Sequence, residues 1–269
     1  MQAVIIGPLA LPAAIFTALL GFLAALLVSL WWQKRGQSVD KALWIIALTG
    51  LAGARLGFLW LYQQQYGSLL AALDIRDGGW WWPGALAALP VAFFFWWRRS
   101  HHRPALLSTL AAALIAITLT QAVLQALKPT DSPVPDITLY TLEGNSRPLR
   151  EVASGTTVVN LWASWCPPCR REMPILEAAQ SRYPEVRFIL ANQGESAARV
   201  RSYLTENRLR FDFLLLDPHA DLGRHAGNRG LPLTLLFDAD GNELDRHFGP
   251  LSEASLHHFL SQRRSGEML

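Results

Sequence analysis

Long uncharged stretches dominate the first half of the chain. No Asp, Glu, Lys or Arg occurs in residues 1–33, 42–54, 78–97 or 104–127. Because a membrane-spanning helix needs about 20 mainly apolar residues, this pattern predicts four helices, near 9–32, 42–62, 79–97 and 105–127. Tryptophans fall near the ends of these segments, where amphipathic rings prefer the headgroup level of a bilayer. The sequence therefore predicts an all-α membrane domain of about four transmembrane helices over residues 1–127.

A different pattern begins after Leu127. Residues 128–135, KPTDSPVP, hold three prolines and predict a short extended linker. Beyond it, apolar runs predict strands near 137–142, 157–163, 186–191, 211–216, 233–238 and 243–248. Helical spacing predicts helices near 168–183, 195–209 and 252–263, the last capped by Ser252. Alternating strands and helices, followed by a hairpin and a final helix, indicate an α/β domain of three layers over residues 136–269.

The distribution of charge predicts an orientation. Before residue 128, eight basic residues stand against three acidic ones, and most of the basic residues lie in the first and third loops: Lys34, Arg35, Lys41, Arg98, Arg99 and Arg103. The positive-inside rule places both loops in the cytoplasm, so both termini and the α/β domain are expected to face outward, which for a bacterial inner membrane is the periplasm. A cleaved signal peptide is the alternative for residues 1–32, but no basic segment precedes this apolar run. The α/β half carries no basic stripe with interleaved aromatic residues, so nucleic acid is not an expected partner.

One arginine, Arg55, lies inside the second predicted span, within Gly53-Ala-Arg-Leu-Gly57. The stretches GLAGARLGFLWLY and IRDGGWWWPGALAAL resemble the early transmembrane region of prolipoprotein diacylglyceryl transferases. That family has a His-Gly-Gly motif where this chain has Pro83, Gly84 and Ala85, and proline cannot act as an acid or a base. We therefore interpret the segment as a transferase-like anchor rather than a transferase. Arg55 either pairs helices beside a face of small residues or binds lipid or a partner.

The only two cysteines lie in the α/β half, in WASWCPPCRREMP. Cys166 follows a predicted strand and Cys169 lies one helical turn further on, with Pro167 and Pro168 between them. A cysteine at a helix N-terminus is favoured as the thiolate, because N–H groups and the helix dipole point toward it. We expect Cys166 to attack disulfides and Cys169 to resolve the mixed disulfide. A purely structural disulfide and half of a zinc site are the alternatives, but the histidines show no second paired spacing for zinc.

The segments VVNLWASWCPPCRREMP, ANQGES, GLPLTLLFDADG and HFGPLS, in this order, resemble the TlpA and ResA branch of thioredoxin-like proteins. The resemblance implies a thiol:disulfide oxidoreductase with no cofactor or metal. It also implies a cis Leu231–Pro232 bond, with Pro232 against the thiols. Glu172 matches the branch's active-site glutamate and could modulate the proton on Cys169, although a solvated carboxylate in the first helical turn is the alternative. Leu233 departs from the branch, which usually has threonine or glutamate there, so the choice of substrate stays open.

Four further residues are expected to contact substrate or partner: Trp165, Pro167, Pro168 and Leu231. Trp162, by contrast, is expected to pack in the core or at its rim. Two prolines between the cysteines leave Cys166 few N–H donors, which weakens thiolate stabilisation and favours a reductase. An oxidase or isomerase working in the oxidising direction and a lipid-modifying transferase are the other candidate functions.

Because the membrane half contains no cysteine, it cannot pass electrons through the bilayer by dithiol exchange. The expected partners are therefore protein disulfides, the lipid bilayer and a separate membrane dithiol donor of the DsbD or CcdA kind. Cytochrome c maturation is one family-based candidate for the pathway, and other envelope disulfides are another.

Overall fold

The computed structural model describes residues 3–6, 9–66, 78–99, 102–127, 133–227 and 230–266. The chain forms two compact units, a helical one that comprises Ala13–Leu73 with Gly79–Lys128, and a second one built mainly from Pro129–Leu269. Residues 128–132 of the predicted linker, and Arg76 in the second predicted loop, lie outside the described residues.

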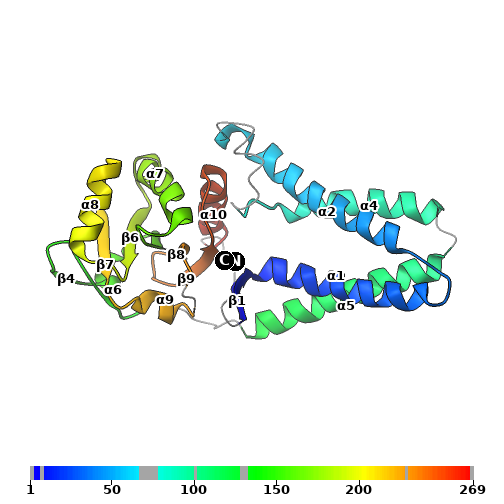
Figure 1. Cartoon of the computed structure of the whole chain (residues 1–269). Coiled ribbons are helices and arrows are strands. Elements are labelled where there is room, and N and C mark those ends of the chain that lie inside the picture. The colour runs from blue at the N-terminus through cyan, green and yellow to red at the C-terminus, as the bar shows by residue number, and fades with distance from the viewer. Residues whose placement is uncertain are drawn as a thin grey trace. The chain divides into compact units, whose positions relative to one another are not determined.

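Among its described residues, the helical unit has four long helices: α1 (Ala13–Gln33), α2 (Asp40–Leu61), α4 (Trp82–Arg99) and α5 (Arg103–Ala126). A short 3₁₀ helix, Gln63–Gln65, follows α2. Helix α1 packs along α5, and α2 packs along α4 (Figure 1). Large apolar side chains such as Leu19, Leu56 and Leu119 are more than half exposed, as expected of helices that face lipid rather than water.

Among the described residues, three helices are long and apolar enough to cross a membrane: α1, α2 and α5. The third predicted span, 79–97, corresponds to α4, which has 18 residues, an internal Pro90 and two arginines at its end. Its short apolar run makes α4 a weaker candidate than the other three. The helical content of this half is thus as predicted, whereas its four-span topology stays a prediction.

Small residues bring α2 and α4 close together. A side chain at Gly53 would collide with the Gly84 carbonyl oxygen and the Ala88 Cβ, each only 2.6 Å from the position of a Cβ. Arg55, two residues after Gly53, is 8% exposed and donates from Nη1 to the Gly79 carbonyl at 2.8 Å. This arrangement favours the helix-pairing interpretation of Arg55, because this hydrogen bond lies within the helical unit.

The N-terminal end differs from the prediction. Leu9–Pro12 forms strand β2, which pairs antiparallel with β1 (Ala3–Ile6), so helix α1 begins at Ala13 instead of near residue 9. Pro12 explains the shift, because the residue before a proline is disfavoured in the α conformation. The predicted helix start was therefore wrong by one turn.

The second unit contains a seven-stranded mixed sheet with the order β4-β3-β7-β6-β5-β8-β9. Its strands are β3 (Thr138–Tyr140), β4 (Ser146–Pro148), β5 (Thr157–Trp162), β6 (Arg187–Gln193), β7 (Phe213–Asp217), β8 (Leu233–Phe237) and β9 (Glu243–Phe248). Strands β5, β6 and β7 run parallel, whereas β8 and β9 are antiparallel. The predicted α/β domain is confirmed, and its sheet is mixed.

Helices cover both faces of this sheet. One face packs against α7 (Pro167–Arg182), α8 (Ala197–Asn207) and α10 (Glu253–Gly266). The other face packs against two short helices, α6 (Leu149–Val152) and α9 (Asp221–His225). Strand β5 is buried along its whole length and lies inside the sheet. The Cys166 loop follows directly from its carboxyl end.

Candidate active site

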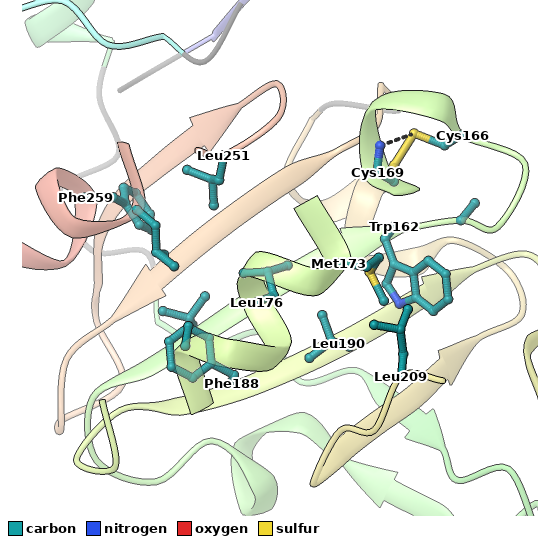
Figure 2. Close-up of a cluster of buried hydrophobic side chains, with 14 of the residues drawn as sticks. Trp162, Cys166, Cys169, Met173, Leu176, Phe188, Leu190, Leu209, Leu251 and Phe259 are labelled. Carbon is teal, nitrogen blue, oxygen red and sulfur yellow. Dashed lines mark hydrogen bonds between the residues drawn. A yellow bond between two sulfur atoms is a disulfide. The ribbon is translucent and has the colours of Figure 1, made fainter. Parts of the chain in front are cut away.

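The two cysteines lie at the N-terminus of α7, just after the loop that leaves β5. Cys166 is the N-cap residue, and Pro167 and Pro168 form the first positions of the helix. A disulfide joins Cys166 to Cys169, and the Cys169 N–H donates to Cys166 Sγ at 3.3 Å (Figure 2). Because the first helical N–H groups have no partner within the helix, the two prolines fit there without losing a hydrogen bond.

Burial distinguishes the residues around the disulfide. Cys166 is 3% exposed and Cys169 is completely buried, next to the fully buried Met173 and Trp162 (Figure 2). Trp165, immediately before Cys166, is instead 63% exposed. The structure therefore places Trp162 in the core and Trp165 at the surface beside the thiols, and contact of Trp165 with a partner stays a prediction. Pro167 is exposed and Pro168 is partly buried.

The Leu231–Pro232 peptide bond is cis, as the resemblance implies. Pro232 is buried and its carbonyl accepts from the Gly249 N–H at 3.1 Å, whereas Leu231 is partly exposed. Leu233 pairs with Leu161 near the end of β5. This register brings Pro232 to the end of the sheet from which the Cys166 loop departs.

Glu172 is completely buried inside α7. Its Oε1 accepts from Asn160 Nδ2 at 2.9 Å, and its Oε2 accepts from the Leu251 N–H at 2.8 Å. Burial raises the pKa of Glu172 to about 8, and the hydrogen bonds from Asn160 and Leu251 only partly oppose this rise. The alternative that Glu172 is a solvated carboxylate is therefore wrong.

A short polar row connects Glu172 to the sheet. Asn160 Nδ2 donates both to Glu172 and to Thr234 Oγ1, the latter at 3.0 Å. Asn160 and Thr234 are cross-strand partners on β5 and β8, and both are buried. Asn160 has no ionisable group, so Glu172 is the titratable member of the row.

The sequence interpretation missed one group of polar residues beside the motif. Glu195, in the loop between β6 and α8, accepts hydrogen bonds from the N–H and hydroxyl of Ser164, both at 2.6 Å. It also accepts from Asn192 Nδ2 at 2.7 Å. Glu195 lies in the ANQGES stretch that carried part of the resemblance, but nothing in its position near a helix start indicates a bond to Ser164, which is 31 residues away.

Family comparisons agree with the two units. A family model described as Redoxin matches residues 129–259, and one described as prolipoprotein diacylglyceryl transferase matches residues 2–125. The thiol-disulfide oxidoreductase ResA of Halalkalibacterium halodurans is 32% identical over 124 residues, which cover 45% of this chain and 70% of ResA. The thiol:disulfide interchange protein DsbE homolog of Paracoccus denitrificans is 39% identical over 97 residues, 36% of this chain and 52% of the homolog.

Among solved structures, a putative thiol:disulfide interchange protein DsbE from Chlorobium tepidum is similar to this chain, with 24% sequence identity and a TM-score of 0.44. The similarity covers 50% of this chain and 97% of that protein.

A mixed sheet with helices on both faces, and a cysteine pair where the central strand meets a helix, define a thioredoxin-like thiol-disulfide oxidoreductase. The identity to ResA, over more than two thirds of that relative, makes the assignment specific. The chain belongs to the ResA family of thiol-disulfide oxidoreductases, with an N-terminal half that resembles prolipoprotein diacylglyceryl transferase.

Proposed function

We propose that this chain is a membrane-anchored disulfide reductase that acts on protein disulfides outside the cytoplasm. The observation that carries the proposal is the Cys166–Cys169 disulfide at the start of α7, where the Cys169 N–H reaches Cys166 Sγ. A hydrogen bond to a sulfur at a helix N-terminus favours its thiolate, which is the form that attacks disulfides. Exposed Trp165 and Pro167, with Pro168, Leu231 and Pro232, are the proposed contact surface for the incoming disulfide.

The proposed reaction consumes one dithiol per substrate disulfide. The Cys166 thiolate attacks one sulfur of the substrate, which breaks the substrate S–S bond and releases one substrate thiolate that takes up a proton. The Cys169 thiolate then attacks Cys166 Sγ, breaks the mixed disulfide and releases the second substrate thiolate. Two electrons have passed to the substrate, and Cys166 and Cys169 are left as the observed disulfide.

Glu172 is the group that we propose to exchange a proton with this dithiol. A carboxyl group with a pKa of about 8 keeps its proton at neutral pH. It can give this proton to the Cys169 thiolate that forms when the disulfide is reduced, and take it back when Cys169 must become a thiolate to attack the mixed disulfide. Glu172 also lies on α7, one helical turn after Cys169. Its burial keeps bulk water from serving the same purpose.

The proposed direction, reduction, rests on the two prolines. Pro167 and Pro168 have no N–H, so the Cys169 N–H is the one recorded hydrogen bond to Cys166 Sγ among the described residues. A less stabilised thiolate makes the dithiol a better reductant. The other direction, oxidation, predicts a pair that stays oxidised in cells and a potential near that of disulfide donors.

The anchor and its orientation complete the proposal. Four spans, with basic first and third loops in the cytoplasm, would leave both termini on the periplasmic side of an inner membrane. Cys166 and Cys169 are the chain's only cysteines, so their electrons must come from a separate membrane dithiol carrier of the DsbD or CcdA kind. Cytochrome c haem-site cysteines are one candidate substrate, and other envelope disulfides are another.

Insulin reduction by the full chain in detergent tests this function. The wild type, reduced first with dithiothreitol, should reduce insulin disulfides, and Cys166→Ser should abolish the reaction. Cys169→Ser should instead trap a mixed disulfide with the substrate, because the resolving thiol is missing. A wild-type chain no more active than Cys166→Ser would refute the proposed function. Trapping with Cys169→Ser in cells would then identify the substrates of an active enzyme.

A further inference from the structure

A tight turn presents Cys166 to the N-terminus of α7. The Cys166 N–H donates to the Ala163 carbonyl at 3.1 Å, so Ser164 and Trp165 are the two central residues of a β-turn. Trp165 is 63% exposed, whereas Ser164 is 4% exposed. The turn therefore has one side chain directed to solvent and one anchored in the protein.

Glu195 is the anchor for Ser164. Its Oε2 accepts from the Ser164 N–H at 2.6 Å and its Oε1 accepts from the Ser164 hydroxyl at 2.6 Å. Asn192 Nδ2 donates to Oε2 at 2.7 Å, and Arg199 Nε lies 3.9 Å from Oε1. The Glu195 side chain is only 7% exposed, so these donors replace most of the water that a carboxylate would otherwise bind.

The bonds to Ser164 connect two separate parts of the fold. Glu195 belongs to the connection between β6 and α8, whereas Ser164 belongs to the connection between β5 and α7. Hydrogen bonds to an ionised carboxylate are roughly twice as strong as those between neutral groups. Glu195 accepts hydrogen bonds from both the backbone N–H and the hydroxyl of Ser164. Two bonds to one residue fix both the position and the orientation of the turn.

We propose that Glu195 is a positioning residue for Cys166. By holding Ser164, it keeps the turn in the geometry in which Cys166 Sγ receives the Cys169 N–H. The inference rests on the proposed role of Cys166 as the attacking thiol, and it extends that role to a residue in a different loop. Glu195 is not proposed to contact the substrate or the sulfur, and it acts only through Ser164.

Position and charge predict opposite results when the carboxylate is removed. If Glu195 acts by position, its loss frees the turn, weakens the bond from the Cys169 N–H and reduces the fraction of Cys166 that is thiolate. If its negative charge dominates, its loss removes a repulsion and increases that fraction. The sign of the change therefore separates the two effects.

The test measures the alkylation rate of Cys166 by iodoacetamide from pH 5 to pH 9, in the reduced full chain in detergent. We expect Glu195→Ala to lower the thiolate fraction at neutral pH by about tenfold. Glu195→Gln should lie much closer to the wild type, because an amide keeps one acceptor for the Ser164 N–H and can donate to its hydroxyl. An unchanged or larger thiolate fraction in Glu195→Ala would overturn the proposal.

Glu177→Ala is the matched control. Glu177 Oε1 also accepts a backbone N–H across the fold, from Arg210 at 2.6 Å, but it holds a segment away from the thiols. Its loss should leave the alkylation profile of Cys166 unchanged. If Glu195→Ala does not fold, Ser164→Ala is measured instead. This variant loses the hydrogen bond from the hydroxyl to Glu195 but keeps the one from the N–H. We expect a smaller loss of thiolate, and an unchanged thiolate fraction would contradict the proposal. Alkylation needs no protein substrate, so this test gives a result even if the chain does not reduce insulin.

Discussion

Glu172 is a carboxyl group with hydrogen-bond donors on both oxygens and no access to water. Asn160 and the Leu251 N–H would favour the charged form, but burial dominates and holds the pKa at about 8. The folded chain consequently keeps a proton on Glu172 over a pH range in which the unfolded chain, with an ordinary value near 4.5, has released it. Folding is therefore coupled to proton binding at this one residue.

The first prediction follows from this coupling. Because the pKa of Glu172 is higher in the folded chain than in the unfolded chain, its contribution to the free energy of unfolding is complete below about pH 4.5. This contribution falls as the pH rises toward 8, by up to about 1.4 kcal/mol per pH unit. Glu172→Gln cannot titrate, so it should lack this decline even if its stability at pH 5 is lower. Thermal unfolding of the oxidised full chain at pH 5, 6.5 and 8 measures the difference. Parallel pH profiles for the two proteins would contradict the burial of an ionisable Glu172.

Residue identities alone could predict the thiols but not the state of Glu172. Cys166 and Cys169 are recognisable because the CxxC spacing itself creates their chemistry. Glu172 in the first turns of a helix is equally consistent with a solvated carboxylate, and only the packing of Leu251 and Asn160 around it excludes water. The hydrogen bonds from Ser164 to Glu195 could not be predicted for the same reason, because they depend on how two loops pack against each other.

At the scale of elements, the start of α10 determines where the Leu251 N–H points. Ser252 and Ser255 bond reciprocally: the Ser255 N–H donates to Ser252 Oγ at 3.1 Å and the Ser252 N–H donates to Ser255 Oγ at 2.7 Å. This is a capping box, and Leu251 and Leu256 on either side of it are both buried in the core. The cap predicted at Ser252 is thus present, and it fixes the backbone that donates to Glu172.

The second prediction concerns this cap. Ser252→Ala should destabilise the oxidised full chain by about 1 kcal/mol, because the helix loses the acceptor for its Ser255 N–H. It should also shift the pH-dependent loss of stability to higher pH, since a less well aligned Leu251 N–H opposes the protonation of Glu172 less. Thermal unfolding across pH measures both effects. Ser261→Ala is the control on the same helix, because its hydroxyl donates only to the His258 carbonyl; an equal pH shift there would contradict the mechanism.

Element prediction succeeded where an apolar run was long enough to decide the structure. Strand β9 was predicted with its observed bounds, and β5 and β8 extend within one residue of theirs. The prediction missed β4, α6 and α9, each of which has five residues or fewer. Such short elements are stabilised by the sheet that they pack against rather than by their own sequence period, so their residues carry little local signal.

At the scale of the whole molecule, the chain combines an oxidoreductase with a helical half that holds none of its redox chemistry. Three helices in the described part of that half are long and apolar enough to span a bilayer, and every cysteine lies in the other half. Each proposed turnover leaves Cys166 and Cys169 oxidised, and two electrons must be supplied before the next one. The helices can anchor the enzyme near a donor, but they offer no thiol to replace that donor.

The last prediction is that the redox state of the cysteine pair in cells depends on a separate membrane dithiol carrier. Cells that express the chain are quenched with acid, and free thiols are labelled with a maleimide reagent that increases the apparent mass. Most of the chain should carry two labels when the carrier is present and none when its gene is deleted, because oxidised Cys166 and Cys169 cannot react. Restoring the carrier should restore both labels. A parallel sample reduced with dithiothreitol before labelling, which should carry two labels, is the control for access of the reagent. A pair that stays reduced without the carrier would show that electrons arrive by another route, and a pair that stays oxidised with it would argue for the oxidising direction.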